Sequence, residues 1–158
     1  MDQPLSTTQL ERIMKKCLPP NVFKGVFSSD HLPRTDHFTL PWCLIANTDC
    51  SHRRGSHWIG MYFDVNADGH YFDSFGHHPT KKEWIQFLQE NSRTGHWVMQ
   101  RRKIQREFSS FCGYYTVYFL FKRHTCPLSE SDYEIMLDVN DNNICQKLQS
   151  VWLQIIRT

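Results

Sequence analysis

The segment FSSFCGYYTVYFLF, residues 108–121, places Cys112 between a small polar turn and a long run of aromatic and aliphatic residues. The length of this run, and the basic residues Lys122 and Arg123 that end it, predict a buried helix, although its aromatic residues are also common in strands. A cysteine in such a position is usually a small, inert core residue. At a helix N-terminus, however, the pKa of a thiol falls and its thiolate becomes a nucleophile. Its role therefore depends on the partners that the rest of the chain supplies.

The chain before this helix has the pattern of a sheet. Residues 41–48 are predicted as a buried strand, and residues 57–65 and 70–76 as a hairpin joined at NADG. Thr80 and Glu83 form a predicted capping box for the helix that follows. The remaining predicted elements are a helix over residues 7–18, an irregular loop over 21–40, a strand over 96–105 and two final helices opened by Ser129 with Asp132 and by Asp141. This order indicates an α+β fold, with a mixed or antiparallel central sheet flanked by helices.

Length and composition set further bounds. A chain of 158 residues fits one domain, residues 1–158, and can bury about two-thirds of its unfolded surface. No apolar run approaches the roughly 20 residues of a membrane span, and the N-terminus lacks a signal-peptide core. The six scattered cysteines suit reduced thiols inside a cell better than a disulfide framework. The net charge of +2 permits contact with polyanions but does not require it.

A nucleophilic Cys112 needs a base and a group that orients it. His57 is the candidate base because it opens a predicted strand after a polar loop; a surface or polar core role is the alternative. Asp64 is an unsuitable orienting group, because it lies seven residues further along the same strand, on the opposite face and roughly 23 Å from His57. If the hairpin turn centres on Asn66, Asp73 becomes a diagonal neighbour of His57 on the same face.

Gln105 is the candidate oxyanion donor. It ends the predicted strand seven residues before Cys112. A side-chain amide there, together with the backbone N–H of Cys112, could hold the oxygen of a tetrahedral intermediate. A solvent-facing polar residue is the alternative, since a lone glutamine is usually no more than that.

The segments GSHW, YFDSFG and FCG, with a glutamine before the last, together resemble the adenovirus protease (adenain) family. That family has a histidine, an acidic residue in an F-E-P-F-G-like strand, a glutamine and a cysteine in this chain order. The resemblance covers roughly residues 40–123 and falls on His57, Asp73, Gln105 and Cys112. It implies a papain-like cysteine protease fold with the catalytic parts in permuted order. The segment GVFSSDHLP also resembles proteases of adenovirus-like mobile elements of the Polinton/Maverick and adintovirus type.

The resemblance implies a cysteine endopeptidase that cleaves capsid or core precursors of a virus or mobile element at Gly-containing sites. Trp58, directly after the base, would wall a narrow substrate channel, or else belong to the core. A monomer in the host nucleus or virion is expected. An activating viral peptide and DNA are candidate cofactors; the basic run QRRKIQR would suit the latter, or form a solvated strand face.

Two departures from the family stand out. Asp73 replaces the usual glutamate, which shortens the reach of the carboxylate by one methylene. The family's peptide cofactor is joined by a disulfide at a cysteine upstream of the nucleophile, and here no cysteine lies between Cys50 and Cys112.

Three alternative functions remain open. The same chain order of catalytic residues occurs in ubiquitin-like-protein proteases, so a deubiquitinase or related protease acting after Gly-Gly tails is the closest alternative. A non-catalytic binding module could retain the fold. A zinc site has the right residue types but lacks the paired C-x₂-C spacing; its ligands would be Cys43, Cys50, His52 and His57.

Overall fold

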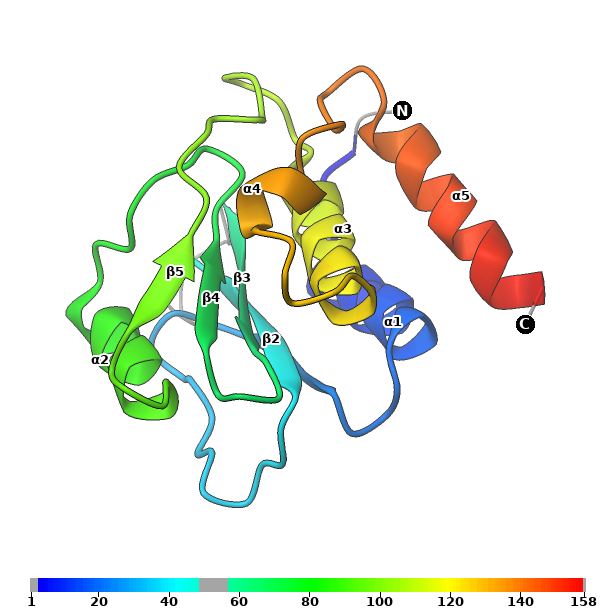
Figure 1. The fold of residues 1–158 in the computed structure, drawn as a ribbon. Helices are drawn as coiled ribbons and strands as arrows, with labels where there is room; N and C mark the ends of the chain where they lie inside the picture. Colours follow the sequence, from blue (N-terminus) through cyan, green and yellow to red (C-terminus); the bar gives the residue numbers. More distant parts are fainter. Residues whose placement is uncertain (1–2, 49–56, 158) are drawn as a thin grey trace.

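A five-stranded mixed sheet forms the centre of the molecule (Figure 1), and the sequence predicts a central sheet with four of these strands. The computed structural model describes residues 3–48 and 57–157, with side chains up to Val151. The strands lie in chain order, with β1 and β2 parallel, β2, β3 and β4 antiparallel, and β4 and β5 parallel. They are β1 (Phe23–Phe27), β2 (Trp42–Asn47), β3 (Trp58–Phe63), β4 (Gly69–Phe72) and β5 (Trp97–Met99).

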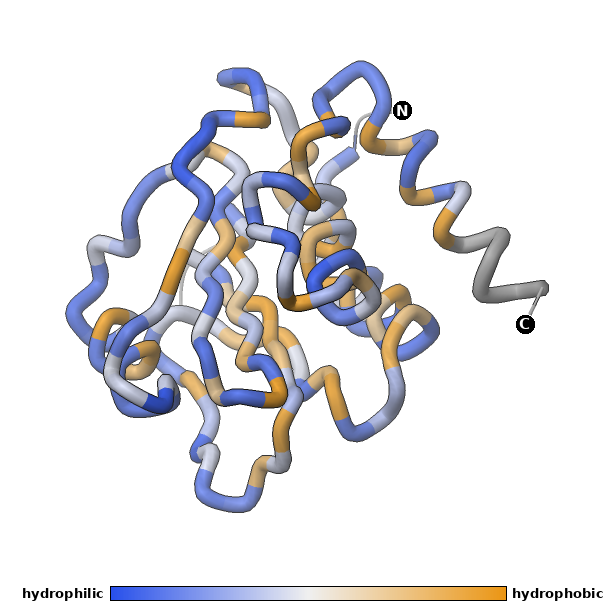
Figure 2. The backbone as a smooth tube through the Cα atoms, in the orientation of Figure 1, coloured by the Kyte–Doolittle hydropathy of each residue, from blue (hydrophilic) through white to orange (hydrophobic). Residues whose placement is uncertain are grey.

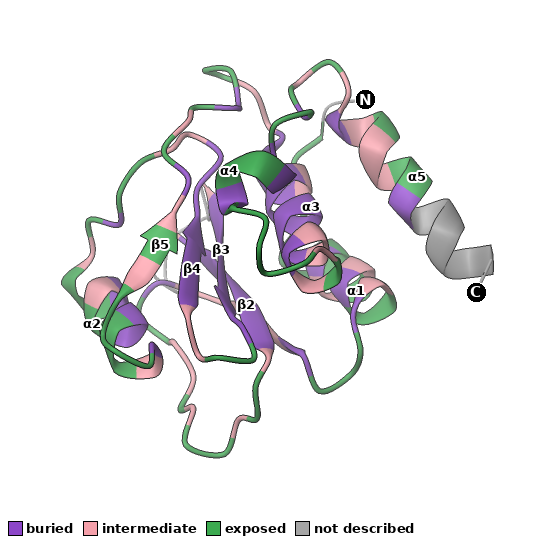
Figure 3. Ribbon diagram, viewed as in Figure 1, coloured by how far each residue is buried: buried purple, intermediate pink, exposed green. Residues whose placement is uncertain are grey.

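Helices cover both faces of this sheet. They are α1 (Thr7–Cys17), α2 (Lys82–Asn91), α3 (Cys112–Thr125), α4 (Asp132–Ile135) and α5 (Ile144–Arg157). Helix α2 packs on one face, whereas α3, with α1 and α4 beside it, covers the other and α5 packs on the outside of α1 and α3 (Figure 1). Apolar residues gather on the central strands and α3 (Figure 2), and these are also the buried parts (Figure 3). None of the helices in the described chain combines the length and apolarity needed to cross a membrane.

Helix α3 confirms the predicted buried helix and packs closely on β3. Nine of its residues are buried, which is why its sequence shows no polar stripe. Gly60 on β3 permits the close approach, since a Cβ there would lie 3.1 Å from Cγ2 of Thr116 and 3.3 Å from Cδ2 of Leu120. The hydroxyl of Thr116, which donates to the carbonyl oxygen of Cys112 at 2.8 Å, also shares its hydrogen with the carbonyl oxygen of Trp58 at 3.3 Å. The same helix therefore fills the core and is fixed lengthwise on the sheet.

The hairpin register is also confirmed. Gly60 pairs with Phe72 and Phe63 with Gly69, so the pairing is centred on residue 66. Continued outward, the same register sets His57 opposite Phe75, and the rings of these two residues contact each other with centroids 4.9 Å apart.

Three local predictions are wrong, each for a physical reason. Strand β1 lies within the predicted loop of residues 21–40, because FKGVF is half-exposed and contains a glycine at φ 137°. The predicted strand over 96–105 ends at Met99, since the following residues leave the sheet and bond to the end of β4 instead. Helix caps also differ: Lys81 precedes α2 without a side-chain cap, and Ser131 with Glu134 caps α4.

A buried ionic cluster anchors α4 to the hairpin. Nδ1 of His70 donates to Asp132 at 2.9 Å, Nε2 donates to Asp64 at 3.1 Å, and Arg123 donates to Asp132 at 3.0 Å. Burial by itself lowers the pKa of His70, but the bonds and charge of Asp132 and the bond of Asp64 outweigh it and raise the pKa. With both nitrogens facing carboxylates, the charged form of the His70 ring is favoured.

The turn after β4 requires a glycine. Gly76 has φ 71°, its N–H donates to the Asp73 carbonyl oxygen at 2.8 Å, and a Cβ there would lie 2.4 Å from the carbonyl oxygen of Arg101. Gly95 has nearly the same φ, 72°, but a Cβ there meets nothing within 4 Å.

Alanine variants at these two positions distinguish the cost of backbone strain from the cost of a steric clash. Gly95→Ala should cost only the left-handed penalty of about 1–2 kcal/mol in the free energy of unfolding. Gly76→Ala should cost clearly more, because a backbone carbonyl must also move. Urea denaturation of both variants checks this. Equal losses would show that the segment at Arg101 yields without cost.

Candidate active site

Cys112 is the first residue of α3, at the end of the helix that carries partial positive charge. Cys112 belongs to the core cluster but keeps a small contact with solvent, at 6% exposure. Phe111 precedes it in the N-cap position, and the N–H of Phe111 donates to the hydroxyl of Ser109 at 3.3 Å. The hydroxyl of Thr116 holds the Cys112 carbonyl oxygen at 2.8 Å. The sulfur is thus fixed at a helix N-terminus, as the sequence predicts.

His57 and Asp73 meet at the ends of the hairpin strands. Nε2 of His57 lies 2.8 Å from Oδ1 of Asp73, and both side chains are largely buried. The same Oδ1 accepts the N–H of Phe75 at 2.8 Å, which fixes the carboxylate. Asp64, the rejected alternative, bonds to His70 instead. The structure therefore brings His57 together with Asp73, as the hairpin register predicts.

Cys112 completes this group on the other side of the imidazole. Burial by itself lowers the pKa of His57, but hydrogen bonds to Asp73 and Cys112 and the charges of both outweigh it and raise the pKa to about 9. Because Nε2 faces Asp73, Nδ1 is the nitrogen left for the sulfur. At neutral pH the ring is then an imidazolium between the carboxylate of Asp73 and the sulfur of Cys112.

Gln105 lies inside the protein rather than at the surface, at 1% exposure. Its Oε1 accepts the hydroxyl of Ser74 at 2.6 Å, and its Nε2 donates to the carbonyl oxygen of Ser109 at 2.8 Å. The surface alternative is thus excluded for this residue. The hydrogen bonds found in the described chain use one of the two hydrogens on Nε2, so a second one remains for a ligand.

Trp58 is placed in the core cluster between β3 and α3. Its indole N–H donates to the carbonyl oxygen of Leu5 at 3.0 Å, and its Cδ1 would lie 3.3 Å from a Cβ at Gly113. The indole thus packs beside the first turn of α3. Its core role is evident, and a role as a substrate wall stays a prediction.

Two buried residues of this site escaped the sequence analysis. Ser74 bonds to Gln105, and Gln100 donates from Nε2 to the Asp73 carbonyl oxygen at 3.4 Å. Both are polar residues inside predicted strands, where alternation suggests a solvent-facing side chain. The pattern DS after an apolar strand was the one available signal for Ser74.

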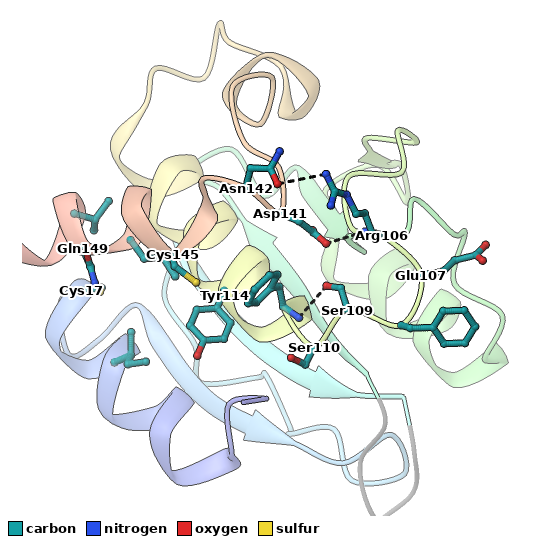
Figure 4. A pocket seen from close by; sticks show the side chains of 15 residues that line it. Cys17, Arg106, Glu107, Ser109, Ser110, Tyr114, Asp141, Asn142, Cys145 and Gln149 are labelled. Atoms are coloured by element: carbon teal, nitrogen blue, oxygen red, sulfur yellow. Dashed lines mark hydrogen bonds between the residues drawn. The ribbon is translucent and has the colours of Figure 1, made fainter. Parts of the chain in front are cut away.

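A cavity of about 1100 Å³ opens beside the segment that leads into Cys112. Residues 106–111, the start of α3 and α5 line it, and α1 closes its far wall (Figure 4). Arg106 bonds to Asn142 across its rim at 3.3 Å, and Phe108 stands fully exposed beside it with φ 62°. The lining is mixed, with apolar residues toward the helices and polar ones at the rim.

No group of three or more metal-ligating side chains occurs within residues 3–48 and 57–157. In the alternative zinc set, Cys50 and His52 lie outside the described residues, and Cys43 is buried beneath α3. His57 is engaged by Asp73 and Cys112. The described part of the set therefore gives no support to a metal site.

The five-stranded mixed sheet, with helices on both faces and α3 packed against β3, is an α+β fold of the kind found in cysteine proteases. Among solved structures, the chain is similar to the ASFV pS273R protease, with a TM-score of 0.52 and 20% sequence identity. The match covers 70% of this chain and 43% of that one. At this identity the likeness shows the fold. Comparisons with protein-family models and with curated proteins found no match.

The bond to Asp73 should dominate the titration of His57. In an NMR titration the His57 ring should change charge near pH 9, and Asp73→Asn should lower this midpoint. The raised pKa also has a stability consequence: the contribution of the bonds is complete below pH 6.5 and is lost as the pH rises through about 9. Asp64→Asn is the matched control, because it should affect His70 and leave the His57 midpoint in place. The reverse pattern would contradict the assignment of Asp73.

Proposed function

We propose that this chain is a cysteine endopeptidase, with Cys112 as nucleophile, His57 as acid and base, Asp73 as orienting carboxylate and Gln105 as oxyanion donor. The observation that carries the proposal is the placement of two groups, Asp73 and Cys112, on the imidazole ring of His57. Oδ1 of Asp73 lies 2.8 Å from Nε2 of His57, and Cys112, at a helix N-terminus, is near enough to the same imidazole to raise its pKa. A buried carboxylate alone does not set His57 apart, since His70 bonds to two of them in a structural role; the thiol at a helix start is the distinguishing feature.

The chemistry follows from this arrangement. The Cys112 thiolate attacks the scissile carbonyl and forms a C–S bond, while the carbonyl oxygen takes up negative charge. The His57 imidazolium gives its proton to the leaving amine, and the C–N bond breaks. His57, now neutral, takes a proton from water, which attacks the thioester and releases the acid product and the thiolate. Asp73 keeps the ring oriented in both steps and favours its charged form.

Negative charge on the carbonyl oxygen requires donors. The N–H of Cys112 lies at the helix start, where backbone donors have no partner within the helix. The Gln105 amide provides a second donor, already fixed at its oxygen end. Fixed donors stabilise the transition state without reorganisation as the charge forms.

For the substrate, we propose Gly-containing sites in structural precursor proteins of an adenovirus-like virus or a Polinton/Maverick-type element. Trp58 packs against Gly113 next to the proposed nucleophile, and this position supports a role as one wall of a narrow approach. A monomer acting in the host nucleus or virion, with peptide or DNA as optional activators, belongs to the same proposal. The second candidate is cleavage after Gly-Gly tails of ubiquitin-like proteins. Cleavage profiling of a peptide library beside such tails decides between the two.

Cys112→Ala should abolish peptide cleavage and leave the circular dichroism spectrum unchanged, because the sulfur is needed only as nucleophile. Thiol alkylation of the wild type at pH 6 should select Cys112. Burial raises the pKa of the Cys17 thiol to about 11 and raises that of Cys43 as well, so both react slowly. Mass spectrometry locates the label. Retained cleavage in the variant, or equal labelling of all six cysteines, would contradict the proposal.

Gln105→Ala should lower kcat by about 10²–10³ and leave KM nearly unchanged, since the donor acts as charge forms on the carbonyl oxygen. Gln105→Glu should be at least as harmful, because a carboxylate repels the oxyanion. Iodoacetamide should still alkylate Cys112 at the wild-type rate in both variants, since that reaction forms no oxyanion. Unchanged turnover in Gln105→Ala would assign the oxyanion to other donors.

A further inference from the structure

Ser74 is a buried polar residue that the reaction scheme above does not use. It directly follows Asp73, is 0% exposed, and directs its hydroxyl to Oε1 of Gln105 at 2.6 Å. Its carbonyl oxygen accepts two further bonds from the same segment, from the N–H of Ile104 at 2.9 Å and of Gln105 at 3.1 Å. One residue thus clamps Gln105 by both its main chain and its side chain.

We propose that Ser74 is a positioning residue, which fixes the Gln105 amide with its nitrogen toward the nucleophile turn. The inference rests on the proposed function of Gln105 and adds the group that makes it effective. An amide presents a donor on one end and an acceptor on the other, and only the donor end stabilises an oxyanion. The orientation of this amide therefore decides whether Gln105 stabilises or destabilises the oxyanion.

The bonds on the two ends of the amide agree on one orientation. Ser74 donates to Oε1, and Nε2 donates to the Ser109 carbonyl oxygen at 2.8 Å. Rotated by half a turn, the amide would set Oε1 against that carbonyl, two acceptors facing each other. Without the Ser74 hydroxyl, Oε1 loses the donor found for it within the described chain, and a buried acceptor without a partner favours displacement.

The same contact ties the oxyanion donor to the triad acid. Asp73 and Ser74 are consecutive at the end of β4, and Gln100 holds the Asp73 carbonyl oxygen from the neighbouring segment. The His57 imidazole and the Gln105 amide are thereby both positioned by residues at the end of β4. The main-chain bonds of Ser74 persist in an alanine variant, so Ser74→Ala tests the hydroxyl alone.

A double-mutant cycle between Ser74→Ala and Gln105→Ala tests the proposal. Ser74→Ala should lower kcat about tenfold, the order expected for one buried hydrogen bond, with KM nearly unchanged. In a Gln105→Ala background it should lower kcat no further, because no amide remains to be positioned. Iodoacetamide should alkylate Cys112 at the same rate in all four proteins.

Ser92→Ala is the matched control, since Ser92 is also buried and donates to the Leu88 carbonyl oxygen at the same 2.6 Å, away from the site. It should leave kcat unchanged. If Ser74→Ala does not fold, Ser74→Cys replaces it, with a weaker donor of similar size and a smaller loss of kcat. Additive losses in the cycle, a loss confined to KM, or an equal loss in Ser92→Ala would each overturn the proposal.

A readout without catalysis separates this inference from the proposed function. In the wild type, NMR should show the Gln105 side-chain amide hydrogens as slowly exchanging, and Ser74→Ala should speed their exchange. If the wild type cleaves no peptide while exchange behaves in this way, the proposed function fails and the positioning stands. If cleavage depends on Cys112 while Ser74→Ala leaves kcat and exchange unchanged, the positioning fails alone.

Discussion

The packing of helix α3 on strand β3 is the contact on which both the core and the site depend. Gly60 lets the helix approach to within van der Waals distance, and the hydroxyl of Thr116 bonds to the strand backbone. Since Cys112 begins this helix and His57 immediately precedes this strand, the same contact sets the distance between sulfur and imidazole. A shift of the helix by one turn, about 5.4 Å, would preserve much of the burial and destroy the site.

Around this contact, each polar group is held from a second direction. His57 is set by Asp73, and Asp73 by the N–H of Phe75. Gln105 is set by Ser74 on the strand side and by Ser109 on the helix side. The hydrogen bonds of the site thus run from the end of β4 through the segment after β5 to the start of α3. This arrangement keeps charged and polar groups in place within a largely apolar interior, where unsatisfied groups would be costly.

The sequence predicts those parts of the molecule that depend on local pattern. The buried run after Cys112 indicates helix α3, and the symmetry of the hairpin about Asn66 correctly places His57 opposite Phe75. What it does not predict depends on contacts across the chain. Strand β1 is stabilised by pairing with β2 rather than by its own pattern, and Ser74 is buried only because the segment after β5 folds back over it. Local residue propensities do not indicate which distant segment of the chain will fold back and pack over Ser74.

The chain order of the elements has a consequence for how the protein assembles. All five strands precede α3, so until that helix packs, much of one face of the sheet, where Tyr62 and Phe72 lie in the core cluster with α3, lacks its cover. The helix that covers this face is also the one that delivers the sulfur to the imidazole. Covering this face of the sheet and aligning Cys112 with His57 are therefore one step, and the thiol gains its partner only when α3 packs on β3.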